Sequence, residues 1–543
     1  MQPLDKAAKV KQVYTELNRK FEEEETQTKA TDQKIAYLNL YGFPIDPQAL
    51  ALVSFDRAQT LGAAIFLKEK NHLKVGITQR TDEASKLLKE LSAQGYLVDV
   101  VMISNSSLQH ALDEYSKVIV SKHKSEAIIL KSSDYQIGAL SELAAKFSGT
   151  SATGMIESIL GFGLHLAASD VHIEPEAGAS KIRFRIDGVL QDAATLPQNI
   201  YQQIISRVKI LSKVKLNVTN TPQDGSFSLT LDSAPIDIRV SVIPSAFGES
   251  VVMRILRQDK GSLQFDELGL TGLAKEQMLQ EIQKPNGMIL TTGPTGSGKT
   301  TTLYAILNKL NEPGVKIITL EDPVEYKLTG ITQTPIDARV GMTFAAGLRA
   351  ILRQDPDIVM VGEMRDLETA ETACQAALTG HIVLSTLHTN DAAATLPRLL
   401  DLGVKPFVLG PAINAIIAQR LVRKICQSCK VVYQLPANLQ SRVEMILKTI
   451  PKASRAEIPS KLIFYHSPGC DKCQGLGYKG RIGVYEMFVI NDAIEKLIIK
   501  MATTTEIKKQ AIVDGMLTMA QDGLLKALQG ITDVEEVFRV TEE

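Results

Sequence analysis

Apolar and polar positions alternate over short periods from about residue 35 onward. Apolar runs with strand character are followed by stretches that have the spacing of an amphipathic helix. The order of these elements predicts a compact α/β domain over residues 35–120, and because it shows no catalytic constellation we interpret it as a docking domain. The predicted strands are 63–67, 73–77 and 97–103, and the predicted helices are 81–94 and about 107–118.

The 34 residues before this domain are mostly polar and include the acidic run Glu22–Glu25. Apolar residues with helical spacing indicate a short amphipathic helix, which we expect to be followed by a flexible stretch. We therefore predict a solvated polar segment over residues 1–34. The residues that define its helix are Val10, Val13, Leu17 and Phe21.

After a predicted connection over residues 121–150, the pattern becomes β-rich and predicts a second domain over residues 151–262. In its clearest strand, residues 182–186, apolar positions alternate with Arg183 and Arg185. These arginines either approach a ligand or form an exposed strand face, and spacing alone leaves both interpretations open. Helices are predicted at 155–168 and 204–214, and further strands at 227–231 and 236–243.

Strands and helices then alternate regularly over residues 263–424. This alternation predicts an α/β core with right-handed crossovers, in which helices cover both faces of a parallel sheet. The predicted strands are 288–290, 315–320, 357–362 and 381–387.

The first of these strands leads into the phosphate-binding pattern G-x-x-x-x-G-K-T, and a helix is predicted after it. Glycines let backbone N–H groups face an anion, Lys299 adds a charge for the β- and γ-phosphates, and the Thr300 hydroxyl is a ligand for Mg²⁺. The flanking strand and helix make a chance glycine-rich turn the weaker interpretation. The predicted ATP-binding residues are Gly293, Pro294, Thr295, Gly296, Ser297, Gly298, Lys299, Thr300 and Thr301.

Acidic residues follow the next two strands. The sequence Glu-Asp-Pro-Val-Glu at residues 321–325 lies at the carboxyl end of the second strand, where an ATPase needs a carboxylate to orient water. Glu363 follows the third strand in a Walker-B-like position near the expected Mg²⁺. The fourth strand is flanked by His381 and His388. Placement of these groups at successive strand ends favours a catalytic site over scattered surface charge.

A helix predicted over residues 343–355 carries Arg349 and Arg353 on one face. A guanidinium group suits either a carboxylate or a phosphate, so both could pair with the acids or reach nucleotide. A surface ion pair with Asp357 is the alternative for Arg353.

Four of the five cysteines form two C-x-x-C pairs, Cys426 with Cys429 and Cys470 with Cys473. Two such pairs complete a tetrahedral Cys₄ site, which favours Zn²⁺. A redox pair or unligated thiols are the alternatives. The long spacing between the pairs predicts an inserted zinc subdomain over residues 425–475, and a helical region follows over residues 476–543.

The chain has 543 residues, a net charge of -1 and 44% hydrophobic residues. This length predicts three or more domains, and the near-neutral charge argues against a dedicated nucleic-acid binder. We find no apolar run of about 18 residues and no secretory leader, so we expect a cytoplasmic protein. A nucleic-acid translocase and a non-catalytic nucleotide-binding scaffold remain the rival hypotheses.

Several of these motifs together resemble the secretion and pilus-assembly ATPase superfamily, which includes the type II secretion ATPase and the type IV pilus extension ATPase. A weaker resemblance over residues 45–115 is to the N-terminal domain by which such ATPases dock onto a membrane platform. Pilus retraction ATPases lack that domain and the Cys₄ element, which favours extension or secretion. The motifs are GPTGSGKTTT, EDPVEY, VMVGEMRDLET, TGHIVLSTLHTNDAAATLPRL, SDVHIEPE, RFRIDGVL and PQDG.

The resemblance implies a RecA-like P-loop core preceded by a PAS-like α+β domain and the small docking domain. It implies that Glu325 activates water with support from Asp322, and that Glu363 is the Walker B acid. The paired histidines, His381 and His388, would couple nucleotide state to motion. The arginines that would approach nucleotide are Arg183, Arg349, Arg353 and Arg481.

The resemblance further implies a homo-hexamer that uses ATP, Mg²⁺ and Zn²⁺ on the cytoplasmic face of an inner membrane. Its partners would be a membrane platform protein and a cytoplasmic docking protein, with indirect coupling to pilin or pseudopilin and no nucleic acid. The chain departs from the family pattern at four positions where the resemblance implies basic residues, namely Gln198, Thr221, Ser226 and Ala346.

Overall fold

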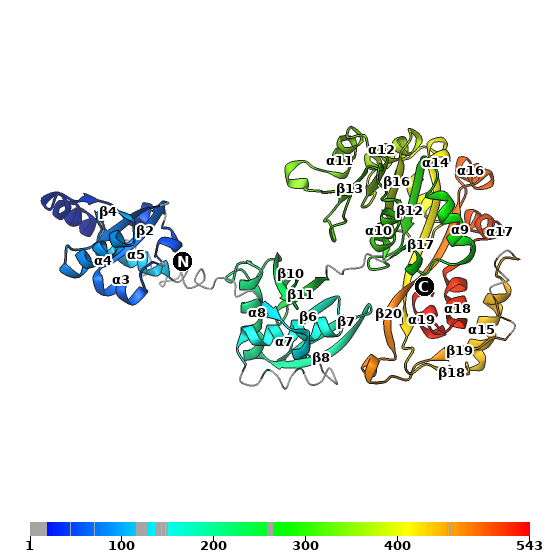
Figure 1. Cartoon of the computed structure of the whole chain (residues 1–543), viewed down its shortest axis with the longest axis horizontal. Helices are drawn as coiled ribbons and strands as arrows, with labels where there is room; N and C mark the ends of the chain where they lie inside the picture. Colours follow the sequence, from blue (N-terminus) through cyan, green and yellow to red (C-terminus); the bar gives the residue numbers. More distant parts are fainter. Residues whose placement is uncertain are drawn as a thin grey trace, which may run out of the picture. The chain divides into compact units, whose positions relative to one another are not determined.

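The computed structural model describes residues 19–542 except 44, 51, 70, 116–127, 136–142, 144–146, 148–149, 258–263, 453, 455–457 and 460. The chain divides into two compact units, Met1–Ile128 and Ile129–Glu543 (Figure 1). None of the described helices has both the length and the apolar composition needed to cross a membrane.

A four-stranded mixed sheet forms the first unit, in the order β1-β4-β3-β2. Leu87 and Leu91 of the amphipathic helix α4 are buried in its core, and Thr81 caps that helix by accepting a hydrogen bond from the Ala84 N–H. The three predicted strands and two predicted helices of this domain are present with shifted ends, and residues 116–118 of the last predicted helix lie outside the described residues. Strand β1 and helix α3 were not predicted. The bounds are β1 Ala36–Tyr37, β2 Ala63–Glu69, β3 His72–Ile77, β4 Leu97–Met102, α3 Phe55–Leu61, α4 Asp82–Ala93 and α5 Asn105–Asp113.

The prediction of a flexible stretch before this domain is wrong for residues 19–32, which are helical, although most of them are exposed as expected. Glu23 is only 7% exposed and accepts hydrogen bonds from the hydroxyls of Tyr37, Ser104 and Ser107 at 2.6, 2.7 and 3.0 Å. The acidic run therefore contains a buried carboxylate whose hydrogen bonds compensate for its lost hydration. Residues 1–18, which hold most of the predicted amphipathic helix, lie outside the described residues.

The second domain is a seven-stranded sheet in the order β5-β9-β10-β11-β6-β7-β8, packed against two helices. Its successive pairs from β9 to β8 are antiparallel. Ile182, Phe184 and Ile186 are buried, which confirms the alternation in the sequence. The bounds are β5 Ile128–Leu130, β6 Asp170–Glu176, β7 Ala179–Ile186, β8 Val189–Pro197, β9 Gln223–Leu231, β10 Ala234–Ser245, β11 Gly248–Arg257, α7 Ala152–His165 and α8 Gln198–Leu211.

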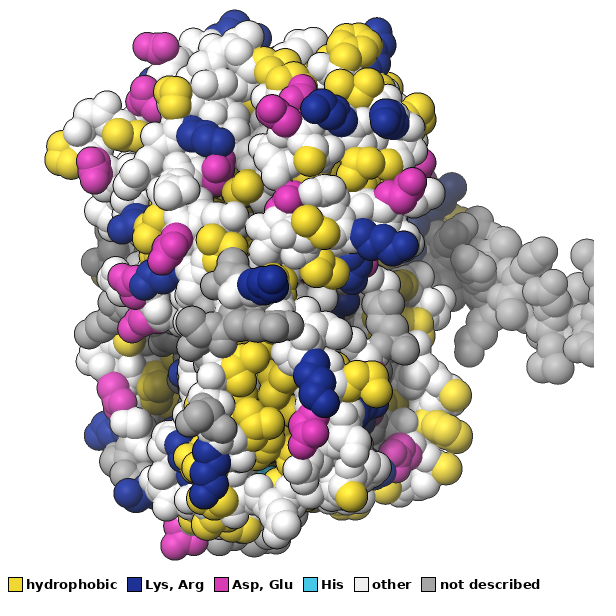
Figure 2. Space-filling view, turned by 90° about the vertical axis from the view of Figure 1, so that its right-hand side faces the viewer, with side chains coloured by type: hydrophobic (Ala, Val, Ile, Leu, Met, Phe, Trp, Pro, Cys, Tyr) yellow, Lys and Arg dark blue, Asp and Glu magenta, His cyan; other side chains and the backbone are white. Residues whose placement is uncertain are grey.

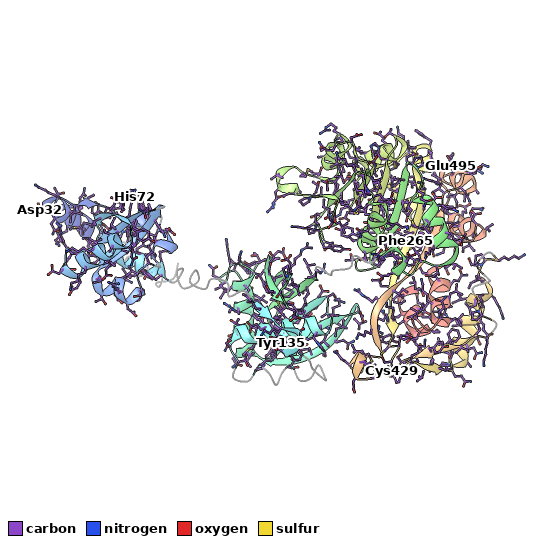
Figure 3. The ribbon with its side chains drawn as sticks, viewed as in Figure 1. Asp32, His72, Tyr135, Phe265, Cys429 and Glu495 are labelled. Atoms are coloured by element: carbon purple, nitrogen blue, oxygen red, sulfur yellow. The ribbon has the colours of Figure 1, made fainter. Side chains whose placement is uncertain are left out.

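Part of the predicted connection over residues 121–150 belongs to this sheet domain instead. Strand β5 lies at the sheet edge beside β9, and Tyr135, labelled in Figure 3, makes an edge-on contact with Phe162 at a ring-centroid distance of 6.4 Å. A Cβ atom on Gly161 would lie 2.5 Å from the Tyr135 ring, so glycine is required for this close packing. The short apolar strand carried too weak a pattern to be recognised in the sequence.

The core contains a second seven-stranded sheet, ordered β14-β13-β15-β16-β12-β17-β20. Neighbouring strands are parallel except β17 and β20, which are antiparallel. Ile289 packs into one apolar cluster, whereas Met288 and Leu290 pack into another. This division confirms the predicted α/β core with both sheet faces covered. The bounds are β12 Gly287–Thr292, β13 Ile317–Glu321, β14 Thr332–Pro335, β15 Ile358–Val361, β16 Ile382–Leu387, β17 Ile413–Ile425, β20 Tyr478–Val489, α10 Lys299–Leu310, α11 Phe344–Leu352, α12 Leu367–Leu378 and α14 Pro406–Ala412.

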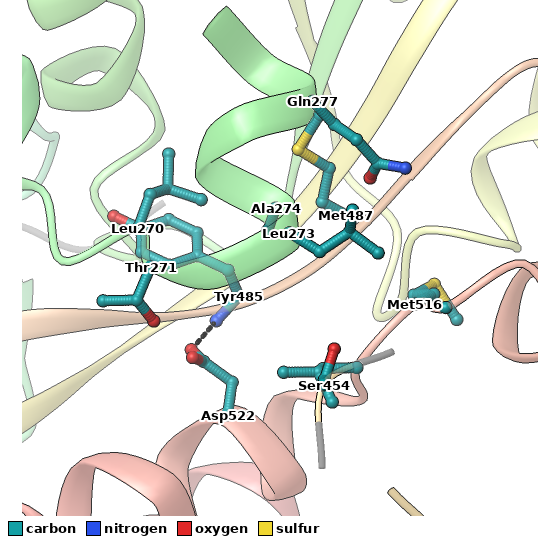
Figure 4. Close-up of a pocket in the computed structure, with 12 residues that line it drawn as sticks. Leu270, Thr271, Leu273, Ala274, Gln277, Ser454, Tyr485, Met487, Met516 and Asp522 are labelled. Carbon is teal, nitrogen blue, oxygen red and sulfur yellow. Dashed lines mark hydrogen bonds between the residues drawn. The ribbon is translucent and has the colours of Figure 1, made fainter. Parts of the chain in front are cut away.

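The prediction of a helical region over residues 476–543 is wrong for Tyr478–Val489, which form strand β20 and pair with β17 in the core sheet. Helices follow from Asp492 onward, and Leu524 and Val537 pack with Val443 in one buried cluster. A small cavity of about 20 Å³ lies between α9 (Gly272–Glu281), β20 and α18 (Met519–Leu528), beside the hydrogen bond from the Tyr485 N–H to Asp522 (Figure 4). Its size suits about one water molecule and excludes a substrate. The remaining helices are α15 Ala437–Lys448, α16 Asp492–Ile499, α17 Thr504–Val513, α18 Met519–Leu528 and α19 Val534–Thr541.

Candidate active site

The phosphate loop turns sharply between the buried strand β12 and the helix α10. Gly293 and Gly298 have φ angles of 143° and 90°, which favour glycine. A Cβ atom on Gly293 would lie 2.6 Å from the backbone oxygen of Gln419 on the neighbouring strand. The loop therefore delivers the N-terminus of α10 to the carboxyl edge of the sheet, where an anion is stabilised by the helix dipole.

Lys299 is buried at the start of α10, with an exposed fraction of 9%. Its Nζ donates to the backbone oxygens of Gly293 and Pro294 at 2.7 and 3.2 Å. Burial lowers the pKa of Lys299 to about 8, while the nearby Glu363 acts in the opposite direction. A phosphate at this edge would therefore meet an ammonium group that is already held inside the loop.

The other predicted ATP-binding residues surround this lysine. Pro294, Thr295, Gly296 and Thr301 are exposed, whereas Ser297 is buried. The tip of the phosphate loop is therefore exposed to solvent.

Glu363 lies just beyond strand β15 and is 16% exposed. It pairs with Arg365 at 2.5 Å and with the His388 Nε2 at 3.5 Å. The hydrogen bond to Glu363 and its charge raise the pKa of Arg365, and the charge of Asp322 raises it further. The structure thus brings the ends of β13, β15 and β16 together beside Lys299. This grouping was expected from the sequence, although the catalytic roles stay predictions.

A threonine pair holds the segment after His388 against the phosphate-loop strand. The Thr292 and Thr389 hydroxyl oxygens lie 2.7 Å apart, and the Thr389 N–H donates to the Thr292 hydroxyl at 2.8 Å. Because β12 and β16 are parallel neighbours, these bonds fix the strand end that carries His388 next to the phosphate loop.

Glu325 is one of two exposed carboxylates of the acidic segment, with Asp322, and its side chain is 40% exposed. Arg239 of β10 lies 3.4 Å from its Oε2 and donates to the backbone oxygen of Val324 at 3.0 Å. Glu325 thus keeps access to solvent, as a group that orients water must. Arg239 was missed in the sequence, where its only signal was a polar position in an alternating strand.

The two histidines predicted to act as a pair lie at opposite ends of β16. His388 contacts Glu363 at the carboxyl end, whereas the ring of His381 lies 3.1 Å from the Ala376 oxygen before the strand begins. The backbone oxygen of His381 also accepts from the N–H of Gly287, the first residue of β12. Within one chain, therefore, His381 is not at the phosphate-loop edge.

The four predicted nucleotide-facing arginines contact groups of this chain. Arg183 pairs with Glu174, Arg349 with Glu368, and Arg481 lies 3.9 Å from Asp187. Within the described parts of the chain, no hydrogen bond joins any of the four to the phosphate loop. Arg353 donates to the Arg349 backbone oxygen at 2.8 Å, while Asp357 accepts from the Lys316 N–H, so the alternative pair of Arg353 with Asp357 is not formed.

Strand β17 supplies two further residues to the site that the sequence did not reveal. Gln419 is buried and donates to the Ser297 backbone oxygen at 2.8 Å, so it braces the phosphate loop. The charge of Arg420 is close enough to lower the pKa of Lys299. Their position follows from the pairing of β17 with β12, which no local pattern in the sequence indicates.

The four cysteines of the two C-x-x-C pairs meet, with all sulfurs within 4.8 Å of one another. The Sγ–Sγ distances are 3.9 Å for Cys426–Cys470 and Cys429–Cys473 and 3.8 Å for Cys470–Cys473. A tetrahedron with Zn–S bonds of about 2.3 Å has edges of roughly 3.8 Å, so the cluster fits zinc. The label of Cys429 in Figure 3 marks its place.

The segment between the two cysteine pairs has its own structure. Strands β18 (Val431–Tyr433) and β19 (Phe464–His466) pair with each other, and α15 lies between them in the chain. This insertion explains the long spacing. Cys374, on α12, is fully buried, and burial raises the pKa of its thiol to about 12, so it belongs to the apolar core.

Comparisons with known proteins identify the family and the fold of this chain. A family model described as type II/IV secretion system protein matches residues 150–539. The type II secretion system ATPase E of Vibrio cholerae is 44% identical over 389 residues, which cover 72% of this chain and 75% of that protein. The type IV pilus assembly ATPase PilB of Thermus thermophilus is 44% identical over 376 residues, covering 69% and 41%. A solved structure of the ATPase DotB of Legionella pneumophila has a TM-score of 0.52 at 20% identity, covering 72% and 96%, and shares the fold.

Proposed function

This chain belongs to the type II/IV secretion system protein family, and we propose that it is an ATPase that powers type II secretion or type IV pilus assembly. The observation that carries the proposal is that the buried Lys299 lies within electrostatic reach of Glu363 at the strand ends of a parallel sheet. The acidic segment nearby carries Glu325, whose side chain is open to solvent. These are the parts that ATP hydrolysis requires.

In this proposal the phosphates of ATP bind at the N-terminus of α10, where Lys299 neutralises the β- and γ-phosphates. The Thr300 hydroxyl and Glu363 would hold Mg²⁺, which supplies charge neutralisation between the phosphates. Glu325, with Asp322 in support, orients the attacking water. His388 contacts Glu363, so a change in nucleotide or Mg²⁺ at Glu363 would be transmitted to the end of β16.

We also propose that the chain works as a homo-hexamer in which Arg183, Arg349, Arg353 and Arg481 approach a nucleotide of the ring. Arg349 and Arg481 have partly exposed side chains, and each lies beside a carboxylate, for which a phosphate is a chemical substitute. His381, away from the phosphate loop of its own chain, would couple nucleotide state to motion through the ring.

The four clustered cysteines are proposed to hold one structural Zn²⁺, because their sulfurs already have the spacing of a tetrahedral site. The first unit would dock onto a platform protein and a cytoplasmic docking protein at the cytoplasmic face of an inner membrane. Movement of the ring would then reach pilin or pseudopilin indirectly. The relatives are named as a type II secretion system ATPase and a type IV pilus assembly ATPase, which supports a role of this chain in such a machine.

A nucleic-acid translocase is the weaker function. Figure 2 shows Lys and Arg side chains interspersed with Asp and Glu on the face in view, rather than gathered into a basic stripe. The net charge of -1 points in the same direction. A purely structural nucleotide-binding scaffold does not need the complete set of Lys299, Glu325 and Glu363.

The proposal is tested in the organism that encodes the chain, by replacing the gene with a Glu325→Gln allele. We expect export of secreted proteins or assembly of pili to stop, because ATP still binds but is not turned over. Glu276→Gln makes the same chemical change at an exposed site on α9 and is the matched control. Export at the control level from Glu325→Gln cells, with equal amounts of protein, would contradict the proposal.

A further inference from the structure

A second carboxylate of the acidic segment, Glu321, has an environment opposite to that of Glu325. It is the last residue of β13 and is 3% exposed. Burying a carboxylate is costly unless hydrogen bonds compensate for its lost hydration. Three hydrogen-bond donors surround Glu321 and compensate for its lost hydration. The carboxylate is therefore engaged with other parts of the fold and not with water.

The three donors come from three different elements. The Tyr304 hydroxyl of α10 donates to one carboxylate oxygen of Glu321. The other oxygen accepts from the Thr319 hydroxyl of β13 at 2.6 Å and from the Gln333 amide of β14 at 3.1 Å. Glu321 therefore joins the helix that begins at the phosphate loop to two adjacent strands of the sheet.

Gln333 extends this network into the segment that follows Glu325. Its amide nitrogen donates to the backbone oxygen of Tyr326 at 3.0 Å, and its amide oxygen accepts from the Leu328 N–H at 2.7 Å. The chain leaving Glu325 is thus held by the same side chain that contacts Glu321.

Tyr304 completes the connection from the side of the phosphate loop. It is fully buried, and its ring makes an edge-on contact with Tyr326 at a centroid distance of 4.7 Å. Burial and the hydrogen bond to Glu321 raise the pKa of Tyr304, while the backbone of Glu325 acts on it in the opposite direction. The hydroxyl therefore stays protonated and lies close to the backbone that carries the proposed base.

We propose that Glu321 and Tyr304 are positioning residues for ATP hydrolysis, which hold the Glu325 segment at a set distance from the phosphate-loop helix. This inference rests on the proposed function, and it adds two residues that touch neither ATP nor water. Their contribution is to turnover rather than to nucleotide affinity, because Lys299 and the loop backbone remain in place without them.

Tyr304→Phe tests the proposal because it removes one hydroxyl and keeps the ring. We expect kcat to fall by about 10- to 100-fold with the ATP dissociation constant within about threefold of the wild type. Tyr326→Phe is the matched control, since it keeps the ring and the backbone oxygen that the network uses. Tyr304→Phe combined with Glu321→Gln should lose less activity than the product of the two single losses, because both substitutions alter the contact between Tyr304 and Glu321.

Hydrogen exchange of the amides over residues 322–331 gives a readout that does not depend on turnover. We expect exchange there to be roughly fivefold faster in Tyr304→Phe than in the wild type, as for the loss of one buried hydrogen bond. Unchanged exchange, an unchanged kcat, equal losses of affinity and rate, or multiplicative effects in the double variant would each overturn the proposal. Absence of turnover in the wild type would instead refute the proposed function, and the exchange data would still decide the role of Tyr304.

Discussion

Glu325→Gln is expected to lower kcat for ATP hydrolysis by about 10²- to 10⁴-fold, the usual contribution of a positioned general base. The amide keeps the size of the side chain but cannot accept a proton from the attacking water. Because the phosphate loop and Lys299 are unchanged, ATP affinity should stay within about threefold. Phosphate release and nucleotide binding, measured on the same preparation, check both halves of this prediction.

Exposure and hydrogen bonding exclude Glu321 as the base but leave both Glu325 and Asp322, which are exposed. The choice of Glu325 between these two rests on the resemblance of the motif to the family. Glu321 is buried with its oxygens occupied, whereas Glu325 is open to solvent. Glu276→Gln is again the control for the loss of one carboxylate. If Glu325→Gln turned over ATP at the wild-type rate while Asp322→Asn did not, the base would have to be reassigned to Asp322.

The second large effect is expected at the cysteine cluster. Cys470→Ser should abolish stoichiometric zinc binding, which we expect at one ion per chain in the wild type. Structural zinc sites contribute roughly 10–16 kcal/mol of apparent binding free energy in zinc-finger peptides at neutral pH, so its loss should unfold the inserted segment. Metal analysis together with hydrogen exchange over residues 431–466 measures the two consequences.

Cys374→Ser provides the control, because this thiol is buried on α12 outside the cluster. It should retain one zinc per chain even if the substitution destabilises the core. A metal-free wild-type protein with four reactive thiols in the cluster would refute the zinc site.

The parts of the site that are local in sequence could be predicted, because their chemistry lies in short motifs. The phosphate loop, Glu363 and the cysteine pairs were recognised from residue type and spacing alone. The contributions of Gln419 and Arg420 were not, since they depend on β17 lying beside β12 in the sheet. Sheet order is a long-range property that hydrophobic periodicity does not encode.

The environments of individual side chains are the second respect in which the structure differs from what the sequence predicts. The run Glu22–Glu25 has the composition of a solvated segment, but Ser104 and Ser107 bury Glu23 through hydrogen bonds from more than 80 residues away. The sequence placed His381 and His388 on either side of one strand, and the structure confirms this with β16 between them. Their action as a pair was implied only by the family resemblance and stays a prediction. Hydrophobic periodicity predicts whether a segment is a helix or a strand, whereas these contacts depend on which helices and strands pack together.

The most direct measurement for the central claim is steady-state ATP hydrolysis by the purified chain, compared with Lys299→Ala and run alongside light scattering of both samples. We predict Mg²⁺-dependent phosphate release by the wild type, and a loss of about 10²-fold or more in the variant because the buried ammonium no longer meets the phosphates. No turnover by an assembled, zinc-loaded wild type, or equal turnover by both proteins, would contradict the account of this chain as an ATPase.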